Sequence, residues 1–423
     1  MSFTSSASEI YLTRVGEELV LNEGVNLATK FPPVKRVLVV GGGVTGLTTT
    51  WALLDAGYDV TVVSEKWASL SDRITSQIAG ALWEWPPAVC GKHTNLISLD
   101  NSKRWCLTSY RALDKLMKTA PVEEHGVRMR AANFFFEQSL NDMPGQLEKM
   151  NEIEAEKEIQ GFLHDPTLVT KHAVNQKAGV VDSYRHLAPV IDTDHYMTWL
   201  RYTVSKKGAR LVTAKISGDL LAQEDKLLAK YNATAIINCT GLNAYETAAD
   251  KTVLPLRGAL IRVINDGKKF PKVTEALCVS HDDTHGADAE DIVFIVPRND
   301  RTLILGGLVQ PHVHTLDLTI NSPEIVRMRE RCNAFVPGLE NAELDPDPFV
   351  QGLRPFRDAN VRVQREQRTR EDGSISHIIH SYGQGGSGFT LSFGCAADVL
   401  GLLEELEAEI PYSSRNVLTQ AHL

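Results

Sequence analysis

The sequence predicts an α/β fold in which a Rossmann-like dinucleotide-binding domain is interleaved with a second, mainly antiparallel β domain. The strongest observation is the segment "VLVVGGGVTGLTTTWALLDAGYDVTVVSE" at residues 37–65, which follows the order strand, glycine turn, helix, strand. A second glycine-dense stretch, "HSYGQGGSGFTLSFGC", follows an apolar run near the end of the chain. Between them, short apolar segments such as "LPLRGALIRVI" and "TLILGGLV" are typical of antiparallel strands.

Composition narrows the classes of partner. The 423 residues are 43% hydrophobic, and 44 Lys+Arg against 53 Asp+Glu give a net charge of -9. This balance argues against a general affinity for nucleic acid or anionic membranes and favours a small-molecule partner. No secretory leader and no apolar stretch of about 18 residues is recognised, so no membrane span is expected. The cysteines are widely spaced, which predicts free thiols.

The first glycine turn has the spacing of a phosphate-binding site. Gly41 permits the tight turn, Gly43 lets a pyrophosphate approach the backbone, and Gly46 lets helix and strand pack closely. The helix predicted over residues 46–57 presents its N-terminus to the phosphates. Glu65, at the end of the next strand, is placed to accept hydrogen bonds from a ribose diol. The motif predicts a dinucleotide site but does not separate NAD from FAD.

Two later stretches return to the same nucleotide. Residues 235–243, "AIINCTGLN", predict a buried strand that ends in Thr240 and Gly241. Residues 378–395 predict a strand, a glycine loop and then an amphipathic helix over residues 389–410, whose N-terminus favours negative charge. The alternative for this loop is a tight strand-to-helix turn without a ligand.

The order of these pieces resembles the D-amino-acid oxidase family of FAD enzymes, which also includes D-aspartate oxidase and, more distantly, glycine and sarcosine oxidases. Matching pieces include "SQIAGALWEW", "INCTGLNA", "LPLRGALIRV", "FIVPRNDRTLILGG" and "GLRPFRDANVRVQRE". The resemblance spans most of residues 36–405 and implies FAD as the cofactor. The N-terminal extension is not family-like, and the stretch 138–180 is hard to match.

The resemblance implies a set of cofactor-binding residues. These are Gly41, Gly43, Val44, Thr45, Gly46, Glu65, Lys66, Ser76, Gly80, Ala81, Thr240, Gly241, Arg354, Gly385, Gly386, Ser387, Gly388, Phe389 and Thr390. No metal site is expected, because no Cys, Asp or Glu cluster accompanies His312 and His314, which are interpreted as surface residues. Cys395 is interpreted as a packed thiol rather than a covalent flavin link.

The substrate side of the site is expected to carry a carboxylate clamp. The resemblance favours Arg362 for this role, with Arg357 as the rival, and assigns the amino group to the carbonyl of Gly386. Phe294 and Trp83 are expected to wall the side-chain pocket. Phe294 stands where the family has a tyrosine, so one carboxylate donor is missing. A second family tyrosine falls at or near Glu290, in an acidic loop that is either a lid or a solvated turn.

The expected reaction is that of an FAD-dependent oxidase. By resemblance, the α-hydride of a D-amino acid or related amine passes to flavin N5, the imine hydrolyses, and O2 takes up the electrons to give H2O2. One alternative is a family member with another substrate, such as a hydroxylated or sugar-like metabolite in a biosynthetic pathway. A flavin-binding protein without turnover is the other alternative.

The distribution of the cofactor pieces predicts discontinuous domains. The FAD-binding domain is expected at residues 36–88, 190–248 and 351–410, and the substrate domain at 89–189 and 249–350. An N-terminal extension, 1–35, and a C-terminal tail, 411–423, flank them.

The last three residues, Ala421, His422 and Leu423, vary on the Ser-Lys-Leu address of the peroxisomal import receptor. Family members often end in such a tripeptide, so a peroxisomal location is expected, and a cytoplasmic one otherwise. Deleting the tripeptide should move a fluorescently tagged protein from peroxisomes to the cytosol of a eukaryotic cell. An unchanged distribution would show that the tripeptide is not read.

Overall fold

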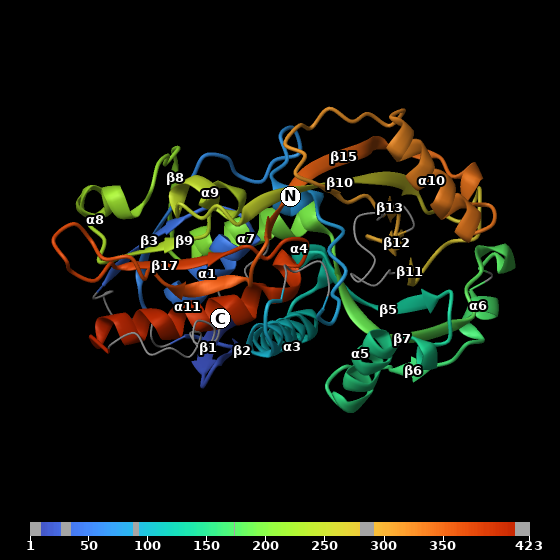
Figure 1. Ribbon diagram of the computed structural model, residues 1–423, viewed down its shortest axis with the longest axis horizontal. Coiled ribbons are helices and arrows are strands. Elements are labelled where there is room, and N and C mark those ends of the chain that lie inside the picture. The colour runs from blue at the N-terminus through green and yellow to red at the C-terminus, as the bar shows by residue number, and fades with distance from the viewer. Residues whose placement is uncertain (1–9, 27–34, 88–92, 173, 280–291, 411–423) are drawn as a thin grey trace.

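The protein was examined as a computed structural model, which describes residues 10–26, 35–87, 93–172, 174–279 and 292–410. Glu290 and the C-terminal tripeptide therefore lie outside the described residues. Two sheets lie side by side, the first at the left of Figure 1 and the second at the right. The expected α/β fold with a mainly antiparallel second sheet is confirmed.

The first sheet is largely parallel and six-stranded. Its order is β16 (Arg362–Arg365), β17 (Ile378–Tyr382), β9 (Ala235–Asn238), β3 (Arg36–Val40), β4 (Asp59–Ser64) and β8 (Arg210–Thr213). Only the edge pair β16 and β17 is antiparallel. Val37, Leu38 and Val39 of β3 are fully buried, because helices cover both faces of the sheet. The unbroken apolar run in the sequence predicted this correctly.

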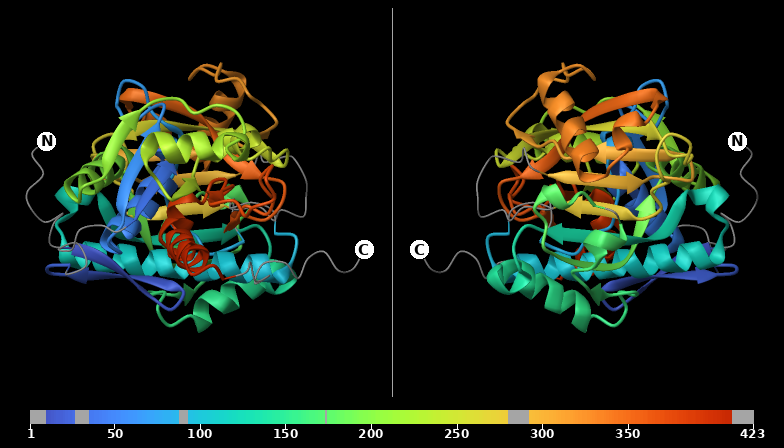
Figure 2. Two further views of the ribbon diagram at one scale, coloured as in Figure 1. Left: turned by 90° about the vertical axis from the view of Figure 1, so that its left-hand side faces the viewer. Right: turned by 90° about the vertical axis from the view of Figure 1, so that its right-hand side faces the viewer.

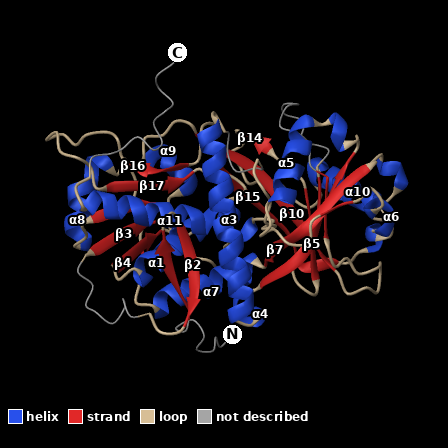
Figure 3. Cartoon of the chain, turned by 90° about the horizontal axis from the view of Figure 1, so that it is seen from below, coloured by secondary structure: helices blue, strands red, loops and turns tan. Residues whose placement is uncertain are grey.

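Helices pack against this sheet and against one another. They are α1 (Val44–Asp55), α3 (Leu96–Thr119), α7 (Thr193–Lys206), α8 (Glu224–Tyr231), α9 (Ala244–Thr247) and α11 (Gly388–Glu407). The helix α11 packs against both α1 and α3. Figure 3 shows α11 and α3 side by side. At that crossing, a Cβ on Gly394 would lie 2.1 Å from the Cα of Trp105.

One expectation for this layer needs correction. The C-terminal helix was predicted to be amphipathic, but every residue from Phe389 to Ala397 is buried, since neighbours surround the first half of α11. The helix α3 lies within residues predicted for the substrate domain, and it packs against α11 of the first layer and against strands of the second sheet. The division of the chain at residue 89 stays a prediction.

The N-terminal extension contributes a two-stranded hairpin, β1 (Ile10–Val15) and β2 (Glu18–Glu23). Its apolar side packs on α1, α3 and α11, and Figure 2 shows it, in dark blue, on the lower side of the molecule. Asp55, whose side chain is fully buried, accepts a hydrogen bond from the Leu12 amide at 2.8 Å and forms an ion pair with Lys207 at 2.8 Å. These bonds satisfy a carboxylate that burial would otherwise penalise.

The second sheet has nine strands. Along the main path these are β14 (Gln310–Pro311), β10 (Val253–Ile264), β13 (Thr302–Gly306), β12 (Val293–Pro297), β11 (Ala276–Val279), β5 (Val127–Phe136), β7 (Asp182–Ile191) and β6 (Leu163–His164), while β15 (Leu344–Arg357) pairs with β10. Only β5 and β11 are parallel. The remaining helices are α2 (Thr75–Ile78), α4 (Val122–His125), α5 (Pro144–Ala155), α6 (Leu168–Lys171) and α10 (Pro323–Phe335).

An ion-pair network joins the two sheets. Arg73, just before α2, contacts Asp194 of α7 at 2.9 Å and Asp347 of β15 at 2.6 Å. Arg262 of β10 reaches the same two carboxylates, at 3.4 and 3.0 Å. The network fixes α2 between the sheets. No helix in these described segments is long and apolar enough to cross a membrane.

A buried histidine makes stability depend on pH. The ring of His186, on β7, stacks on Phe134, its Nδ1 lies 3.1 Å from the Leu187 carbonyl oxygen, and its Nε2 has no partner among the described residues. Burial lowers the pKa of His186 to about 4. In the unfolded chain this histidine takes up a proton at about pH 6.5, whereas in the folded protein it does so only near pH 4. The contribution of the neutral ring to the free energy of unfolding is therefore present above about pH 6.5 and is lost as the pH falls toward 4.

The substitution His186→Phe keeps an aromatic ring in the stack and removes the titrating group. We expect a smaller drop in melting temperature between about pH 7.5 and about pH 5 than in the parent protein. The measurement is thermal unfolding followed by circular dichroism at both pH values. An identical drop in the two proteins would contradict this explanation.

Candidate active site

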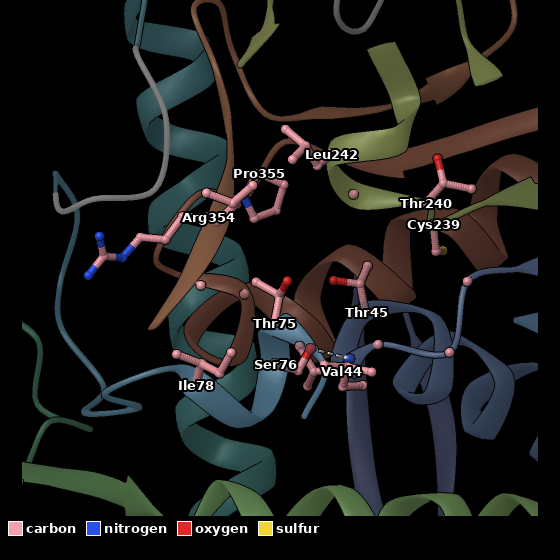
Figure 4. Close-up of a pocket in the computed structure, with 18 of the residues that line it drawn as sticks. Val44, Thr45, Thr75, Ser76, Ile78, Cys239, Thr240, Leu242, Arg354 and Pro355 are labelled. Carbon is pink, nitrogen blue, oxygen red and sulfur yellow. Dashed lines mark hydrogen bonds between the residues drawn. The ribbon is translucent and has the colours of Figure 1, made fainter. Parts of the chain in front are cut away.

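A cavity of about 460 Å³ lies where the first sheet meets the second. Its floor is built at the carboxyl ends of β3, β4, β9 and β17, the position at which open parallel sheets bind ligands. Strands β10 and β15 of the second sheet and the helix α2 complete its walls. Figure 4 shows Thr45, Ser76, Thr240 and Arg354, which line it from four separate segments; the Arg354 side chain extends away from the other three.

The first glycine turn has backbone packed against backbone. A Cβ on Gly41 would lie 2.2 Å from the carbonyl oxygen of Cys239, and one on Gly46 would lie 2.0 Å from that of Gly41. The helix α1 starts directly after Gly43, which supplies no side-chain cap. The amide of Val44 donates instead to Ser76 Oγ at 3.0 Å, the dashed line in Figure 4. The turn and the helix N-terminus therefore fit a pyrophosphate.

The end of β4 forms one extremity of the cavity. Glu65 and Lys66 line it, as predicted, together with Lys215 from the segment after β8. The Glu65 carboxylate lies 3.4 Å from Lys215 Nζ, and Lys66 pairs with Asp72 at 2.7 Å. An acidic group at this strand end suits the ribose of a dinucleotide. The sequence motif did not indicate Lys215, since β8 is remote from the glycine turn in the chain.

Most of the predicted cofactor residues meet in this one cavity. Those that line it are Gly41, Gly43, Val44, Thr45, Glu65, Lys66, Ser76, Gly80, Thr240, Gly241, Arg354, Gly385, Gly386, Gly388 and Phe389. Those that do not are Gly46, Ala81, Ser387 and Thr390. Thr390 is buried in the first turn of α11. Thr390 is therefore not part of the cavity lining, and its contact with the cofactor stays a prediction.

Glycines of the second sheet also face the cavity. Gly258 of β10 pairs with Gly352 of β15, and both line the space. A Cβ on Gly258 would lie 2.3 Å from Nη1 of Arg354, so the arginine lies directly against that backbone. The sequence did not reveal these two glycines, because each lies within an ordinary strand pattern and their pairing joins distant parts of the chain.

Arg354 is the unusual cation of the site. Its side chain is mostly buried, and Nη1 donates to the Leu308 carbonyl at 3.1 Å. Burial lowers the pKa of Arg354 to about 10, with no anion opposing the shift. Among the described residues no carboxylate lies within ion-pair distance of it. Arg73, by contrast, lines the same cavity but has both of its carboxylate partners in place.

The predicted clamp, Arg362, does not line the cavity. It lies on the edge strand β16, where Nη1 donates to Tyr382 Oη at 2.5 Å and lies 3.8 Å from Asp250. The rival, Arg357, donates to the same Asp250 at 2.7 Å. Both arginines are held by protein partners. Arg357 and Arg362 are therefore not part of the cavity lining, whereas Arg354, which the resemblance had placed only among the cofactor residues, is part of it.

The predicted aromatic walls lie behind the cavity rather than in it. The ring of Phe294 supports the chain at Gly80, where a Cβ would lie 2.7 Å from ring atoms Cε1 and Cζ. Trp83 is buried in the core, with Nε1 donating to the Cys106 carbonyl at 3.1 Å. Neither ring is part of the lining.

The remaining candidates have no contact with the cavity. His312 and His314 are exposed, and no cluster of three or more metal-ligating side chains exists in the described part of the chain. The thiol of Cys395 is fully buried in α11. The described cysteines are all free.

The comparisons with known proteins assign the family. Residues 36–400 match the family model DAO, described as FAD dependent oxidoreductase, and the chain belongs to this family. It is 30% identical to a D-amino-acid oxidase of Streptomyces coelicolor over 364 residues, 86% of this chain and 95% of that protein. It is 25% identical to a D-aspartate oxidase of Talaromyces thermophilus over 396 residues, 88% and 95% of the two chains.

Solved structures share the fold at low identity. Glycine oxidase from Geobacillus kaustophilus has a TM-score of 0.66 and 15% identity, with 88% of this chain and 95% of that chain covered. L-alpha-glycerophosphate oxidase from Mycoplasma pneumoniae, solved with FAD bound, has a TM-score of 0.63 and 17% identity, with 88% and 94% covered.

The protein is thus an FAD-dependent oxidoreductase, and its cavity fits that cofactor. The glycine turn and the N-terminus of α1 suit the pyrophosphate, and the carboxylate of Glu65 suits a ribose. The backbone at Gly385, Gly386 and Gly388, in the loop that leads into α11, also lines the cavity.

The substitution Gly46→Ala should abolish FAD retention, because its methyl group would collide with the Gly41 carbonyl oxygen and separate α1 from β3. The control is Gly373→Ala, in an exposed turn outside the cavity lining, where a Cβ would meet nothing within 4 Å. The measurement is visible flavin absorbance per mole of purified protein. Equal flavin content in Gly46→Ala and the parent protein would refute the steric argument.

Proposed function

We propose that the protein is an FAD-dependent amino acid oxidase in which Arg354 binds the substrate carboxylate. The single observation that carries the proposal is the mostly buried side chain of Arg354, which lines the cofactor cavity without a carboxylate partner among the described residues. A buried arginine in this condition favours an incoming anion, and its planar fork suits a carboxylate held by two hydrogen bonds.

The protein's own residues position the substrate for the reaction. Gly258 and Gly352 leave space beneath Arg354, so that a small acid can lie against the backbone of β10 and β15. Gly386 follows Gly385, whose amide donates to the Pro355 carbonyl of β15 at 3.0 Å, and the carbonyl of Gly386 is proposed to accept a hydrogen bond from the amino group. FAD, when bound, accepts the electron pair and hydrogen of the α C–H bond, with O2 as the proposed final acceptor.

The preference for D-amino acids is supported by the similarity to D-amino-acid oxidases. A second candidate is oxidation of another anionic metabolite that carries a hydroxyl group, because Arg354 can bind the anionic group of either class of substrate. A substrate panel of D-amino acids, L-amino acids and 2-hydroxy acids, read by peroxide release, separates the two candidates.

The substitution Arg354→Met should lower kcat/KM for an amino acid by about a hundredfold or more, because a charge-assisted pair in a partly desolvated site is lost. The decisive measurement is the ratio of kcat/KM for the amino acid to that for the amine without its carboxylate. Arg354→Met should bring this ratio close to one, whereas Arg362→Met should leave the ratio unchanged. The opposite pattern would return the clamp to Arg362.

A further inference from the structure

A chain of buried hydrogen bonds lies behind the cofactor cavity. We propose that Glu366 and His380 act through Asn238 as positioning residues, which hold the turn at Thr240 in place and so set the affinity for FAD. This inference rests on the FAD site and not on the identity of the substrate. It is therefore independent of the role proposed for Arg354.

The chain of contacts is continuous. Asn238 and His380 face each other across the parallel strands β9 and β17, and both are fully buried. Nδ2 of Asn238 lies 3.2 Å from Nδ1 of His380, and Nε2 of His380 lies 3.1 Å from Oε2 of Glu366. The side chain of Glu366 is only 1% exposed, so water does not compete for these bonds.

The direction of every bond follows from the charge of Glu366. Burial acts to raise the pKa of this carboxyl group, but hydrogen bonds from His380 and Arg368 outweigh burial and hold the pKa well below its usual range. Glu366 is then an acceptor only, so Nε2 of His380 carries the hydrogen. Burial lowers the pKa of His380 to about 4, which leaves its Nδ1 as an acceptor near neutral pH.

This tautomer fixes the amide of Asn238. Its Nδ2 donates to His380, so its Oδ1 points the other way and accepts from the Thr240 amide at 3.2 Å and from Thr240 Oγ1 at 2.8 Å. Because the Thr240 hydroxyl donates to Asn238, it accepts from Thr247 Oγ1 at 2.7 Å. Every atom in this series of hydrogen bonds can therefore be assigned as a donor or an acceptor without conflict.

The anchored turn forms part of the cavity wall. The strand β9 ends at Asn238, and Thr240, Gly241, Leu242 and Asn243 all line the cavity. The side-chain bonds of Asn238 hold the start of this turn beyond the last strand residue. A change at His380 therefore reaches the cofactor through the position of the turn, although His380 itself is not part of the lining.

The charges around His380 also favour this arrangement. Glu366 receives a second donor from Arg368 Nη2 at 2.6 Å and lies 3.7 Å from Arg362 Nη2. These arginines keep Glu366 ionised, and they disfavour a second proton on His380. The ring of Tyr382 packs edge-on against His380 and adds no donor or acceptor to Nδ1.

The test is the dissociation constant of FAD for the apoprotein, measured from the quenching of flavin fluorescence. The substitution His380→Leu removes the acceptor at 3.2 Å from Asn238 Nδ2 and leaves only the longer contact with Thr247 Oγ1 at 3.4 Å, so it should raise this constant about tenfold or more. The matched control is His164→Leu, which breaks a histidine–carboxylate contact of 2.8 Å with Asp182 on the second sheet and should leave the constant unchanged. An unchanged constant in His380→Leu would overturn the proposal.

A double-mutant cycle with Thr240→Val tests the route. If His380 acts through the turn, His380→Leu should add little to the effect of Thr240→Val, whereas independent effects would multiply. Multiplied effects would overturn the proposed route.

Should His380→Leu fail to fold, His380→Asn replaces it, since an amide of that length cannot reach Asn238 and Glu366 at once. It should raise the constant as well, and an unchanged constant would again overturn the proposal.

Discussion

The cavity exists because backbone rather than side chains occupies the places where its lining is packed most closely. At Gly41 and Gly46, in the first layer, the chain packs so closely that any side chain would collide with a carbonyl oxygen. At Gly258, in the second sheet, the same closeness brings the guanidinium of Arg354 against a strand. Glycine has no Cβ and tolerates these contacts, at some cost in conformational entropy on folding. The glycines therefore decide what space remains for a ligand.

Charge is distributed unevenly around that space. The arginines that join the sheets, Arg73 and Arg262, are matched by Asp194 and Asp347, so they hold the walls together without leaving net charge in the cavity. Arg354 has only a carbonyl oxygen as its acceptor among the described residues. Inside a protein, an unmatched charge attracts a counter-ion more strongly than it would in water. Arg73 and Arg262 therefore stabilise the fold, whereas Arg354 is available to bind a ligand.

Local patterns in the sequence predicted the parts of the fold that depend on neighbouring residues. The segment from β3 to β4 follows the expected order, with the helix ending before Gly57 at a φ of 90°. The packing of α3 was not predictable in this way, because its partner α11 lies almost three hundred residues further along the chain, as the bond between Ser109 and Phe393 shows. The described part of the N-terminal extension is likewise ordered by distant partners.

The choice among the arginines shows why the site was harder to predict than the fold. Arg354, Arg357 and Arg362 lie within nine residues, and the spacing alone does not say which one faces the cavity. The strand pairing shows which arginine faces the cavity. Arg354 lies two residues from Gly352, on the same face of β15, whereas Arg362 belongs to β16 in the other sheet. A strand that leaves one sheet and a strand that enters another are separated here by four residues, 358–361. Which residue binds a ligand therefore depends on where the chain changes sheets, and that position is set by pairing with β10 and β17 rather than by the local sequence.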